Sequence, residues 1–282
     1  MGREENVSIY IDTRILCKEH NGLKEAIAES IKSQKLILEK DTVPCVNNNL
    51  YSEPVQITVS KKRSYEAASA YKNQKVCVHN FASASNPGGG VAMGASAQEE
   101  CLCRCSTLYP CLNTSEMWDG FYTPHRNAQN PIHNDDIIYT PGVVVIKTDT
   151  ESPELMKEED WYKVNVITCA APNLGRHPGN RYNSGDGNEA VEAAKSELMA
   201  IHEKRLRRIL DVAALEGNEV VILGAFGCGA FCNDPEVVAQ AAKKVIADYR
   251  YMFRTIEFAV YCRPWDEGNY LVFDRVISGM RK

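Results

Sequence analysis

The 282-residue sequence lacks the features that direct a protein into a membrane or a secretory pathway. No apolar run is long enough to span a bilayer, and the charged start MGREEN is unlike a signal peptide. N-myristoylation is not expected, because Asn6 stands where the motif needs serine or threonine. We therefore expect a cytoplasmic protein without a membrane partner, and we expect it to be a monomer.

An excess of positive charge is also missing. The chain has 32 lysines and arginines against 37 aspartates and glutamates, which gives a net charge of −5. A broad basic face for binding nucleic acid is therefore not expected. An anionic ligand would have to be held by backbone N–H groups and by the N-terminal ends of helices.

Complete metal-binding patterns are absent, although the chain has eleven cysteines. Cys101, Cys103 and Cys105 are spaced by two, which scatters them around a helix. Cys228 and Cys232 form one pair, but no second spaced pair completes a zinc site. No aspartate cluster has the pattern that binds hard cations. The sequence therefore predicts reduced thiols, no metal and no cofactor.

The sequence does contain a glycine-rich turn between a predicted strand and a predicted helix. An extended apolar run ends at Phe81, the turn signal Asn86-Pro87 follows, and three glycines come next. Three consecutive glycines leave the backbone open to close approach by a ligand. Gln98-Glu99-Glu100 then opens a helix predicted to continue to Leu108, and its carboxylates are favoured near the positive end of the helix dipole.

A second glycine-rich loop, GAFGCGAFCNDP, follows the apolar run that ends at Leu223. Asp234 is the predicted N-cap of the next helix, and Pro235 is its predicted first residue. Such a strand, loop and helix start can surround an anion with N–H groups. The loop is neither a Walker loop nor a GxGxxG dinucleotide fingerprint. Taken alone, it supports a ligand site and a plain strand-to-helix connection equally well.

Apolar runs that alternate with helical patterns predict an α/β fold. The expected sheet is mainly parallel or mixed, with helices on both faces and ligands outside the carboxyl ends of its strands. Residues 111–139 look irregular, and His125 and His133 are expected to be surface or packing side chains. The predicted strands span residues 55–59, 76–80, 142–148, 164–171, 219–223 and 256–262, and the predicted helices span residues 6–40 with a loop near 21–22, 64–71, 98–108, 189–216 and 267–278.

Three glycines followed by Gln-Glu-Glu resemble the signature of poly(ADP-ribose) glycohydrolases, most closely the short bacterial-type branch. NFASASNPGGG, AQEECLCRCSTLY, IIYTPGVVVIKTD and GAFGCGAFCNDP resemble pieces of that branch in the same order. The resemblance implies a macrodomain-like mixed sheet flanked by helices. It implies a glycohydrolase domain over residues 61–282, with residues 1–60 as a helical accessory region packed on it.

The resemblance also implies an enzyme that hydrolyses the O-glycosidic ribose–ribose bond and releases ADP-ribose. Glu100 would be the general acid and would then activate water, Glu99 would hold ribose hydroxyls, and Gln98 would help place the pair. The charge of Glu99 is expected to raise the pKa of Glu100. The candidate contacts at the terminal ribose are Asn86, Gly88, Gly89, Gly90 and Val91. Those at the diphosphate are Ala225, Phe226, Gly227, Cys228, Gly229, Ala230 and Phe231. The two phenylalanines would pack against a ribose or the adenine.

Other functions stay open at this point. The same pocket could remove single ADP-ribose units from protein side chains or from a DNA base, and residues 111–139 would then decide the leaving group. A reader that binds ADP-ribose without cutting it is a second alternative, although a reader of an anion gains little from two carboxylates. A nucleotide-binding α/β enzyme of another kind is the third. In each ADP-ribose case the partner is ADP-ribose or its polymer, attached to protein or to DNA.

Overall fold

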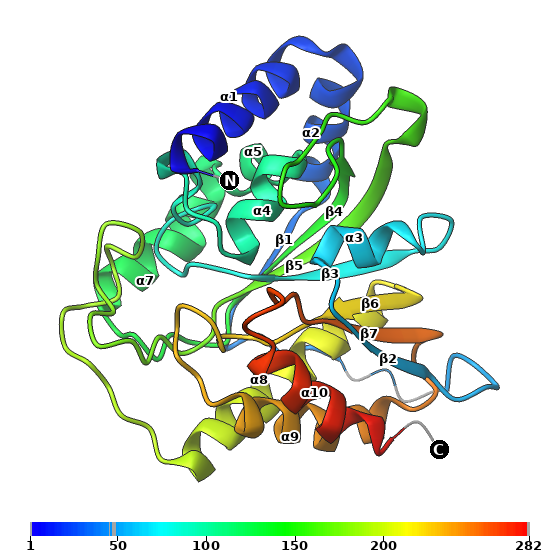
Figure 1. The fold of residues 1–282 in the computed structure, drawn as a ribbon, viewed down its shortest axis with the longest axis vertical. Helices are drawn as coiled ribbons and strands as arrows, with labels where there is room; N and C mark the ends of the chain where they lie inside the picture. The colour runs from blue at the N-terminus through cyan, green and yellow to red at the C-terminus, as the bar shows by residue number, and fades with distance from the viewer. Residues whose placement is uncertain (1, 45, 47–48, 281–282) are drawn as a thin grey trace.

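A seven-stranded mixed sheet runs through the molecule and carries helices on both faces (Figure 1). The structure, a computed structural model, describes residues 2–44, 46 and 49–280. The order of the strands is β1-β4-β5-β3-β6-β7-β2. Their bounds are Lys35–Ile37 (β1), Gln56–Ser60 (β2), Val76–Phe81 (β3), Ile137–Val145 (β4), Tyr162–Cys169 (β5), Val220–Leu223 (β6) and Thr255–Ala259 (β7). The predicted α/β fold, a mixed sheet flanked by helices, is confirmed.

Five neighbouring strands of this sheet are parallel. β3 pairs in parallel with β5 and β6, and β7 pairs in parallel with β6 and β2. β4 runs antiparallel to β5 and to β1. Because the parallel strands point the same way, the segments that follow them meet at one edge of the sheet, where open α/β sheets bind ligands.

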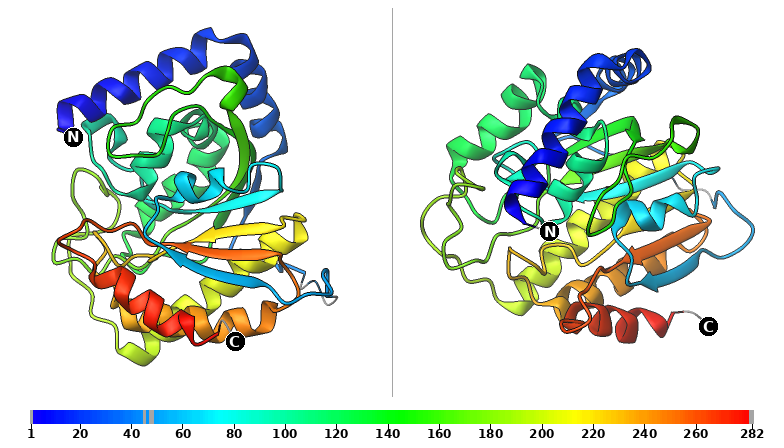
Figure 2. Two further views of the ribbon diagram at one scale, coloured as in Figure 1. Left: turned by 45° about the vertical axis from the view of Figure 1, so that its right-hand side comes forward. Right: turned by 45° about the horizontal axis from the view of Figure 1, so that its top comes forward.

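Helices α8 to α10 cover one face of the sheet, and α3 to α5 cover the other (Figures 1 and 2). The first face buries the rings of Phe253, Phe258 and Phe273, and the second buries Tyr65 and Leu102. Helix α1 packs over α4, and α2 packs against β4. The bounds are Arg3–Glu19 (α1), Asn21–Ser33 (α2), Ser64–Ser69 (α3), Gln98–Cys105 (α4), Leu108–Leu112 (α5), Lys195–Leu215 (α8), Pro235–Ile246 (α9) and Gly268–Ser278 (α10), with short helices at Val91–Met93 (η1), Glu158–Asp160 (η3) and Ala247–Tyr249 (η4).

The prediction that residues 111–139 are irregular is wrong. This segment contains the end of α5, then α6 (Ser115–Met117), a π-helical turn (Trp118–Tyr122, η2), α7 (Thr123–Ala128) and the start of β4. Each piece is shorter than the window over which helical periodicity can be recognised. His125 and His133 are buried, as expected of packing side chains, and His125 contacts the Phe121 carbonyl and Asn134 Oδ1, both at 2.8 Å.

Several predicted boundaries also need correction. The N-terminal helix breaks at His20, which caps α2 by accepting a hydrogen bond from the Leu23 N–H, so the loop predicted at residues 21–22 is the first turn of α2. Strand β1 was not predicted, β4 begins five residues earlier than expected, and α8 begins at Lys195. Strands β1 and β2 form the two edges of the sheet, so residues before 61 contribute strands as well as helices.

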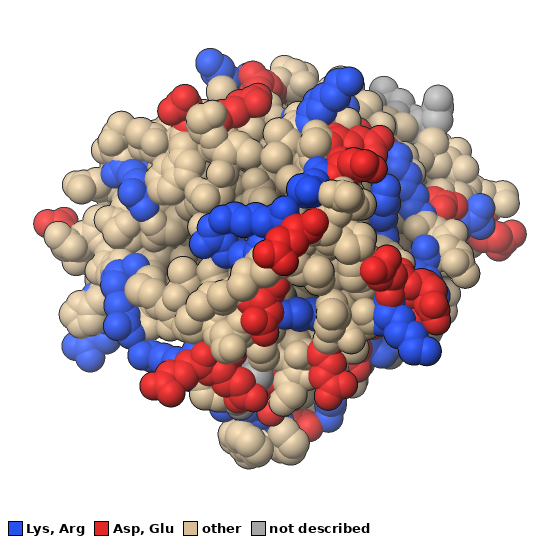
Figure 3. Space-filling view, turned by 90° about the horizontal axis from the view of Figure 1, so that it is seen from above, with Lys and Arg blue, Asp and Glu red and all other residues tan. Residues whose placement is uncertain are grey.

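The surface mixes charges of both signs. On the face seen from above, lysine and arginine side chains lie interspersed with aspartate and glutamate (Figure 3). Across the described residues, no helix combines the length and the apolar character needed to cross a membrane. The ten cysteines in the described part of the chain are free thiols, and seven of them are buried.

Asp234 allows a direct test of how α9 begins. Its side chain accepts a hydrogen bond from the Glu236 N–H at 2.9 Å, and the helix starts at Pro235, as predicted. We predict that Asp234→Ala lowers the free energy of unfolding by about 1 kcal/mol, because a first-turn N–H group loses its acceptor. Asp234→Asn keeps a capping oxygen and should cost less in urea denaturation. Equal losses in the two variants would assign the effect to the ion pair with Lys195 instead.

Candidate active site

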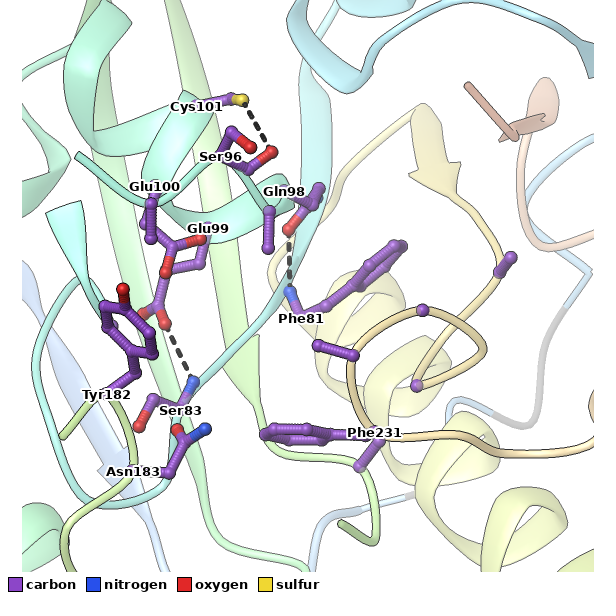
Figure 4. A pocket seen from close by; sticks show the side chains of 18 of the residues that line it. Phe81, Ser83, Ser96, Gln98, Glu99, Glu100, Cys101, Tyr182, Asn183 and Phe231 are labelled. Atoms are coloured by element: carbon purple, nitrogen blue, oxygen red, sulfur yellow. Dashed lines mark hydrogen bonds between the residues drawn. The ribbon is translucent and has the colours of Figure 1, made fainter. Parts of the chain in front are cut away.

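A cleft of about 890 Å³ lies at the carboxyl ends of the parallel strands. Its walls come from the segments after β2, β3, β5, β6 and β7 and from the first turn of α1. Glu99 and Glu100 stand on one side of it, and Phe231 lies across from them (Figure 4). Both glycine-rich loops reach this cleft, with Gly89 from the first and Gly227 and Gly229 from the second.

Gln98 joins the start of α4 to the end of β3. Its Oε1 accepts a hydrogen bond from the Phe81 N–H at 2.9 Å, and its Nε2 donates to the His79 carbonyl at 2.8 Å. Nε2 also donates to Ser64 Oγ at 2.9 Å, which ties in the start of α3. With the strand end and the helix start fastened together, the side chains of the next two residues have fixed directions.

Glu99 is held by two donors. Its Oε2 accepts a hydrogen bond from the Ser83 N–H at 2.7 Å, and its Oε1 accepts one from Asn80 Nδ2 at 3.3 Å. Only 3% of the residue is exposed. Because both oxygens accept hydrogen bonds, the carboxyl group of Glu99 has a fixed orientation.

Glu100 has one occupied and one free oxygen. Its Oε1 accepts a hydrogen bond from the Gly90 N–H at 2.9 Å. Its Oε2 is buried and has no hydrogen-bond partner within the described residues, although the residue lines the cleft. A buried ionised oxygen without a donor is costly, so this atom suits a proton or a donor supplied by a ligand.

Burial is the main cause of the pKa shifts of Glu99 and Glu100. It raises the pKa of Glu100, against the hydrogen bond from Gly90, which lowers it. Burial also raises the pKa of Glu99, and the hydrogen bond from Ser83 opposes this shift. The charge of Glu100 adds to the shift of Glu99 only after these two causes. The charge of Glu99 was expected to raise the pKa of Glu100, but it is not among the main causes of that shift, of which burial is the largest.

The three glycines are needed because protein side chains press against them. Gly89 has a φ of +56°, and a Cβ there would stand 2.6 Å from Glu100 Oε1. A Cβ on Gly90 would collide with the ring of Tyr182. The close approach expected of a ligand is thus made here by the catalytic candidates themselves and by a tyrosine from a distant loop.

The second loop carries backbone N–H groups without a hydrogen-bond partner in the described residues, and it lines the cleft. Within the described residues, the N–H groups of Gly229, Ala230 and Phe231 have no hydrogen-bond acceptor. The carbonyls of Gly227 and Phe231 instead point inward to Asn233 Nδ2, each at 3.1 Å. Free N–H groups on one side and bonded carbonyls on the other give the loop the electrostatics of an anion site.

Asn233 is a supporting residue that the sequence reasoning missed. Its Nδ2 also donates to the Pro172 carbonyl at 2.7 Å, and its Oδ1 contacts His202 Nε2 at 2.8 Å. Burial lowers the pKa of His202 to about 4, so the imidazole is neutral near pH 7 and donates this hydrogen bond. One buried amide therefore connects the second glycine loop to the segment after β5 and to α8.

The segment between β5 and α8 is fastened to the first glycine loop by Asp186, which is 1% exposed. Its carboxylate accepts hydrogen bonds from Asn173 Nδ2 at 2.9 Å and Ser85 Oγ at 3.2 Å, and it lies 3.3 Å from His133 Nε2. The sequence signal for this support was the unusual length of the polar stretch after residue 172, since long loops are commonly functional.

The structure brings some of the predicted site residues to the cleft and not others. Phe226 is 5% exposed and lies under the loop, with ring centroids 4.5 Å from His79 and 5.8 Å from Phe81, so it belongs to the core and its expected contact with a ligand has no support here. The predicted residues that line the cleft are Gly89, Gln98, Glu99, Glu100, Ala225, Gly227, Gly229, Ala230 and Phe231. The predicted residues that are not part of this lining are Asn86, Gly88, Gly90, Val91, Phe226 and Cys228.

The chain matches one protein-family model and is similar to several solved structures. Residues 4–148 match the model of the microbial-type PARG catalytic domain. The chain is similar to poly(ADP-ribose) glycohydrolase (PARG) from Thermomonospora curvata, with 26% identity and a TM-score of 0.81 over 97% of this chain and 99% of that one. The same enzyme bound to the inhibitor ADP-HPD matches with 26% identity and a TM-score of 0.80, over 96% and 99%.

Poly(ADP-ribose) glycohydrolase from Deinococcus radiodurans in complex with ADP-ribose is similar to the chain as well. It shares 27% identity and a TM-score of 0.76, over 91% of this chain and 98% of that one. No curated protein matches the chain in sequence.

The burial of Glu100 predicts how stability depends on pH. Its folded pKa is raised above the unfolded value, so its contribution to stability is fully present below about pH 4.3 and is lost as the pH rises through the folded pKa. Glu100→Gln removes this loss, so its Tm should exceed that of the wild type at pH 8 and converge with it near pH 4. Calorimetry across this range measures the difference.

The exposed Glu116 serves as the control for this experiment. Glu116→Gln should follow the wild type at every pH. A Glu100→Gln protein that is less stable than the wild type at pH 8 would contradict the assignment of a raised pKa.

Proposed function

Because this chain belongs to the microbial-type PARG catalytic-domain family, we propose that it hydrolyses poly(ADP-ribose) by acid–base catalysis at Glu100. The protein is a glycosidase that releases ADP-ribose from the polymer. The observation that supports the role of Glu100 best is its buried oxygen Oε2, which lacks a partner in the described residues and belongs to a side chain that lines the cleft. A protonated carboxyl at this place is ready to donate to a leaving oxygen.

The second glycine loop suits the diphosphate of the bound ADP-ribose unit. Its unpaired N–H groups at Gly229, Ala230 and Phe231 can hold phosphate oxygens without a cationic side chain. Phe231 faces Glu99 and Glu100 across the cleft (Figure 4). With the diphosphate on the second loop, the terminal ribose would lie between Phe231 and these two glutamates. Glu99 would then hold ribose hydroxyls beside Glu100.

The opposite part of the cleft suits the adenine. Arg63 contacts Cys101 Sγ at 3.4 Å and its guanidinium lies 3.9 Å from the centroid of Tyr261. Cys101 lies away from Tyr182 and Phe231 in Figure 4, at the far side of Gln98. A flat guanidinium and an aromatic ring offer surfaces on which a base can stack.

The reaction proceeds in two proton transfers. Glu100 gives its proton to the oxygen that leaves C1 of the terminal ribose, and the C–O bond breaks with development of an oxocarbenium-like cation. The negative phosphates of the substrate can stabilise this cation. The ionised Glu100 then takes a proton from water, whose oxygen bonds to C1. The products are free ADP-ribose and a polymer shortened by one unit, and Glu100 is protonated again.

Several finer expectations belong to the same proposal. They are the macrodomain-like assignment of the fold, the division of the chain near residue 60, a cytoplasmic location and a monomeric state. An attachment of the substrate to DNA as well as to protein is likewise a prediction.

Substitution of Glu100 tests its role in catalysis. Glu100→Gln and Glu100→Ala should each lower the release of ADP-ribose from the polymer by at least about a hundredfold, because the proposed proton donor is lost. The affinity for ADP-ribose, measured by calorimetry, should stay close to that of the wild type, and Glu116→Gln should be fully active. Full turnover by both variants would remove Glu100 from the mechanism.

Asn233 tests whether the second loop needs its support. Asn233→Ala should weaken the binding of ADP-ribose roughly tenfold, because the carbonyls that Asn233 holds inward are free to turn toward the phosphates. Asn73 is exposed, so Asn73→Ala is the matched control and should bind normally. Unchanged affinity of a folded Asn233→Ala protein, checked by circular dichroism, would contradict the anion-site assignment.

A further inference from the structure

A buried arginine lies one helical turn after Glu100. Arg104 is part of α4, is 2% exposed and does not line the cleft. Within the part of the chain that the structure describes, it has no carboxylate at ion-pair distance, and its Nε has no hydrogen-bond acceptor. A cation that loses its hydration without a paired anion costs stability. Packing alone therefore does not account for an arginine at this position.

Arg104 is connected to Glu100 through the first glycine turn. Its Nη1 donates a hydrogen bond to the Ala95 carbonyl at 2.5 Å, and the Ala95 N–H donates to the Gly90 carbonyl at 3.2 Å. The Gly90 N–H in turn donates to Glu100 Oε1 at 2.9 Å. Three consecutive hydrogen bonds therefore connect the guanidinium of Arg104 to the carboxyl group of Glu100. Loss of the first bond would release the Ala95 carbonyl at the end of the turn that holds Glu100.

Further contacts fix the guanidinium and the backbone that carries it. Arg104 Nη2 donates to Cys101 Sγ at 3.2 Å, and Cys101 lines the cleft directly after Glu100 (Figure 4). Thr13 Oγ1, from α1, donates to the Arg104 carbonyl at 2.6 Å. Arg104 therefore contacts the turn that precedes Glu100 in the sequence and the residue that follows it.

The positive charge of Arg104 acts on Glu100 as well. Residues four apart on a helix lie on the same side of it, so Arg104 follows Glu100 along one side of α4. Burial raises the pKa of Glu100, and Arg104 is among the groups that lower it. The cation favours the ionised carboxylate that forms when Glu100 gives up its proton.

Other titratable groups surround Glu100 and are common to all variants of Arg104. Within α4 they are Glu99 and the thiols of Cys101 and Cys103, and burial raises the pKa of both thiols, so the thiols are neutral near pH 7. The surrounding elements contribute Arg3 in α1, Arg63 before α3, His79 in β3, Tyr109 in α5, Asp149 after β4 and Tyr182 after β5. A difference between variants at position 104 thus reports on Arg104 itself.

We propose that Arg104 is a positioning residue, which holds the turn of residues 90–95 against Glu100 and places a buried positive charge near the carboxylate that forms in the reaction. This inference rests on the proposed function, in which Glu100 acts first as an acid and then as a base. Burial alone would favour the protonated form in both steps. The cation makes the ionised form accessible without touching the substrate, since Arg104 is not part of the cleft lining.

The pH dependence of hydrolysis separates this role from a purely structural one. Arg104→Met removes the charge and the hydrogen bonds but fills the same space. On poly(ADP-ribose), its kcat near pH 7 should fall roughly tenfold while KM stays within about twofold, because the acid is misplaced and the substrate contacts remain. The alkaline limb of its kcat/KM profile should move to higher pH by roughly one unit, because a nearby cation is lost. A loss of folded protein would lower the rates without moving this limb.

Arg104→Lys separates the charge from the hydrogen bonds. Its alkaline limb should stay within about 0.3 pH units of the wild type, because the positive charge remains. Its kcat should fall about threefold, because one ammonium group cannot reproduce the fork that reaches both Ala95 and Cys101. Arg207→Met is the control: Arg207 lies on α8 in an exposed ion pair with Asp248, and its loss should change neither kcat nor the limb.

An alkaline limb that stays in place in a folded Arg104→Met protein would overturn the proposal, and so would a wild-type kcat in that variant. If Arg104→Met does not fold, Arg104→Lys decides alone. A lower kcat with an unmoved limb supports the positioning role, whereas a shifted limb or a wild-type kcat overturns it. Failure of the wild-type protein to release ADP-ribose from the polymer would instead overturn the proposed function itself.

Discussion

The hydrogen bond from the Gly90 N–H to Glu100 Oε1, 2.9 Å long, joins the first glycine turn to the start of α4. It fixes one oxygen of the carboxyl and leaves the other buried without a partner in the described residues. The bond requires the backbone of the turn to lie directly on the carboxylates, and at Gly89 a Cβ would stand only 2.6 Å from the same oxygen. The glycine turn and Glu100 are therefore one structure, in which burial raises the pKa of the proposed proton donor.

The rest of the fold positions the glycine turn and Glu100 at one edge of the sheet. Parallel strands deliver the turn, the second glycine loop and the long loop after β5 to one edge of the sheet. Gln98 fastens the start of α4 to β3, and Asn233 and Asp186 fasten the other two loops behind the cleft. These three side chains are polar and buried or half-buried, and each satisfies several backbone or side-chain groups at once. Such networks are costly to leave incomplete, so they hold the site in one arrangement.

Much of this arrangement could be predicted from the sequence, because its signals are local. Three glycines, a Gln-Glu-Glu helix start and an Asp-Pro cap are each readable within a few residues, and alternating strands and helices predicted the sheet. Tyr182, Asn233 and Asp186 could not be found in this way, because their roles depend on contacts with residues 61 to 101 positions away. Phe226 was misplaced for a related reason, since the direction of a side chain in a loop depends on the core beneath it. The helices between residues 111 and 139 were missed because each is too short to show a period.

The central claim is that the free oxygen of Glu100 delivers a proton to the bond that breaks. A crystal structure of this protein with ADP-ribose in the cleft tests it most directly. The account predicts Glu100 Oε2 within hydrogen-bond reach, about 3 Å, of the oxygen on C1 of the terminal ribose, with the diphosphate on the N–H groups of residues 229–231. A terminal ribose bound away from Glu100, with another acidic side chain at that oxygen, would contradict it.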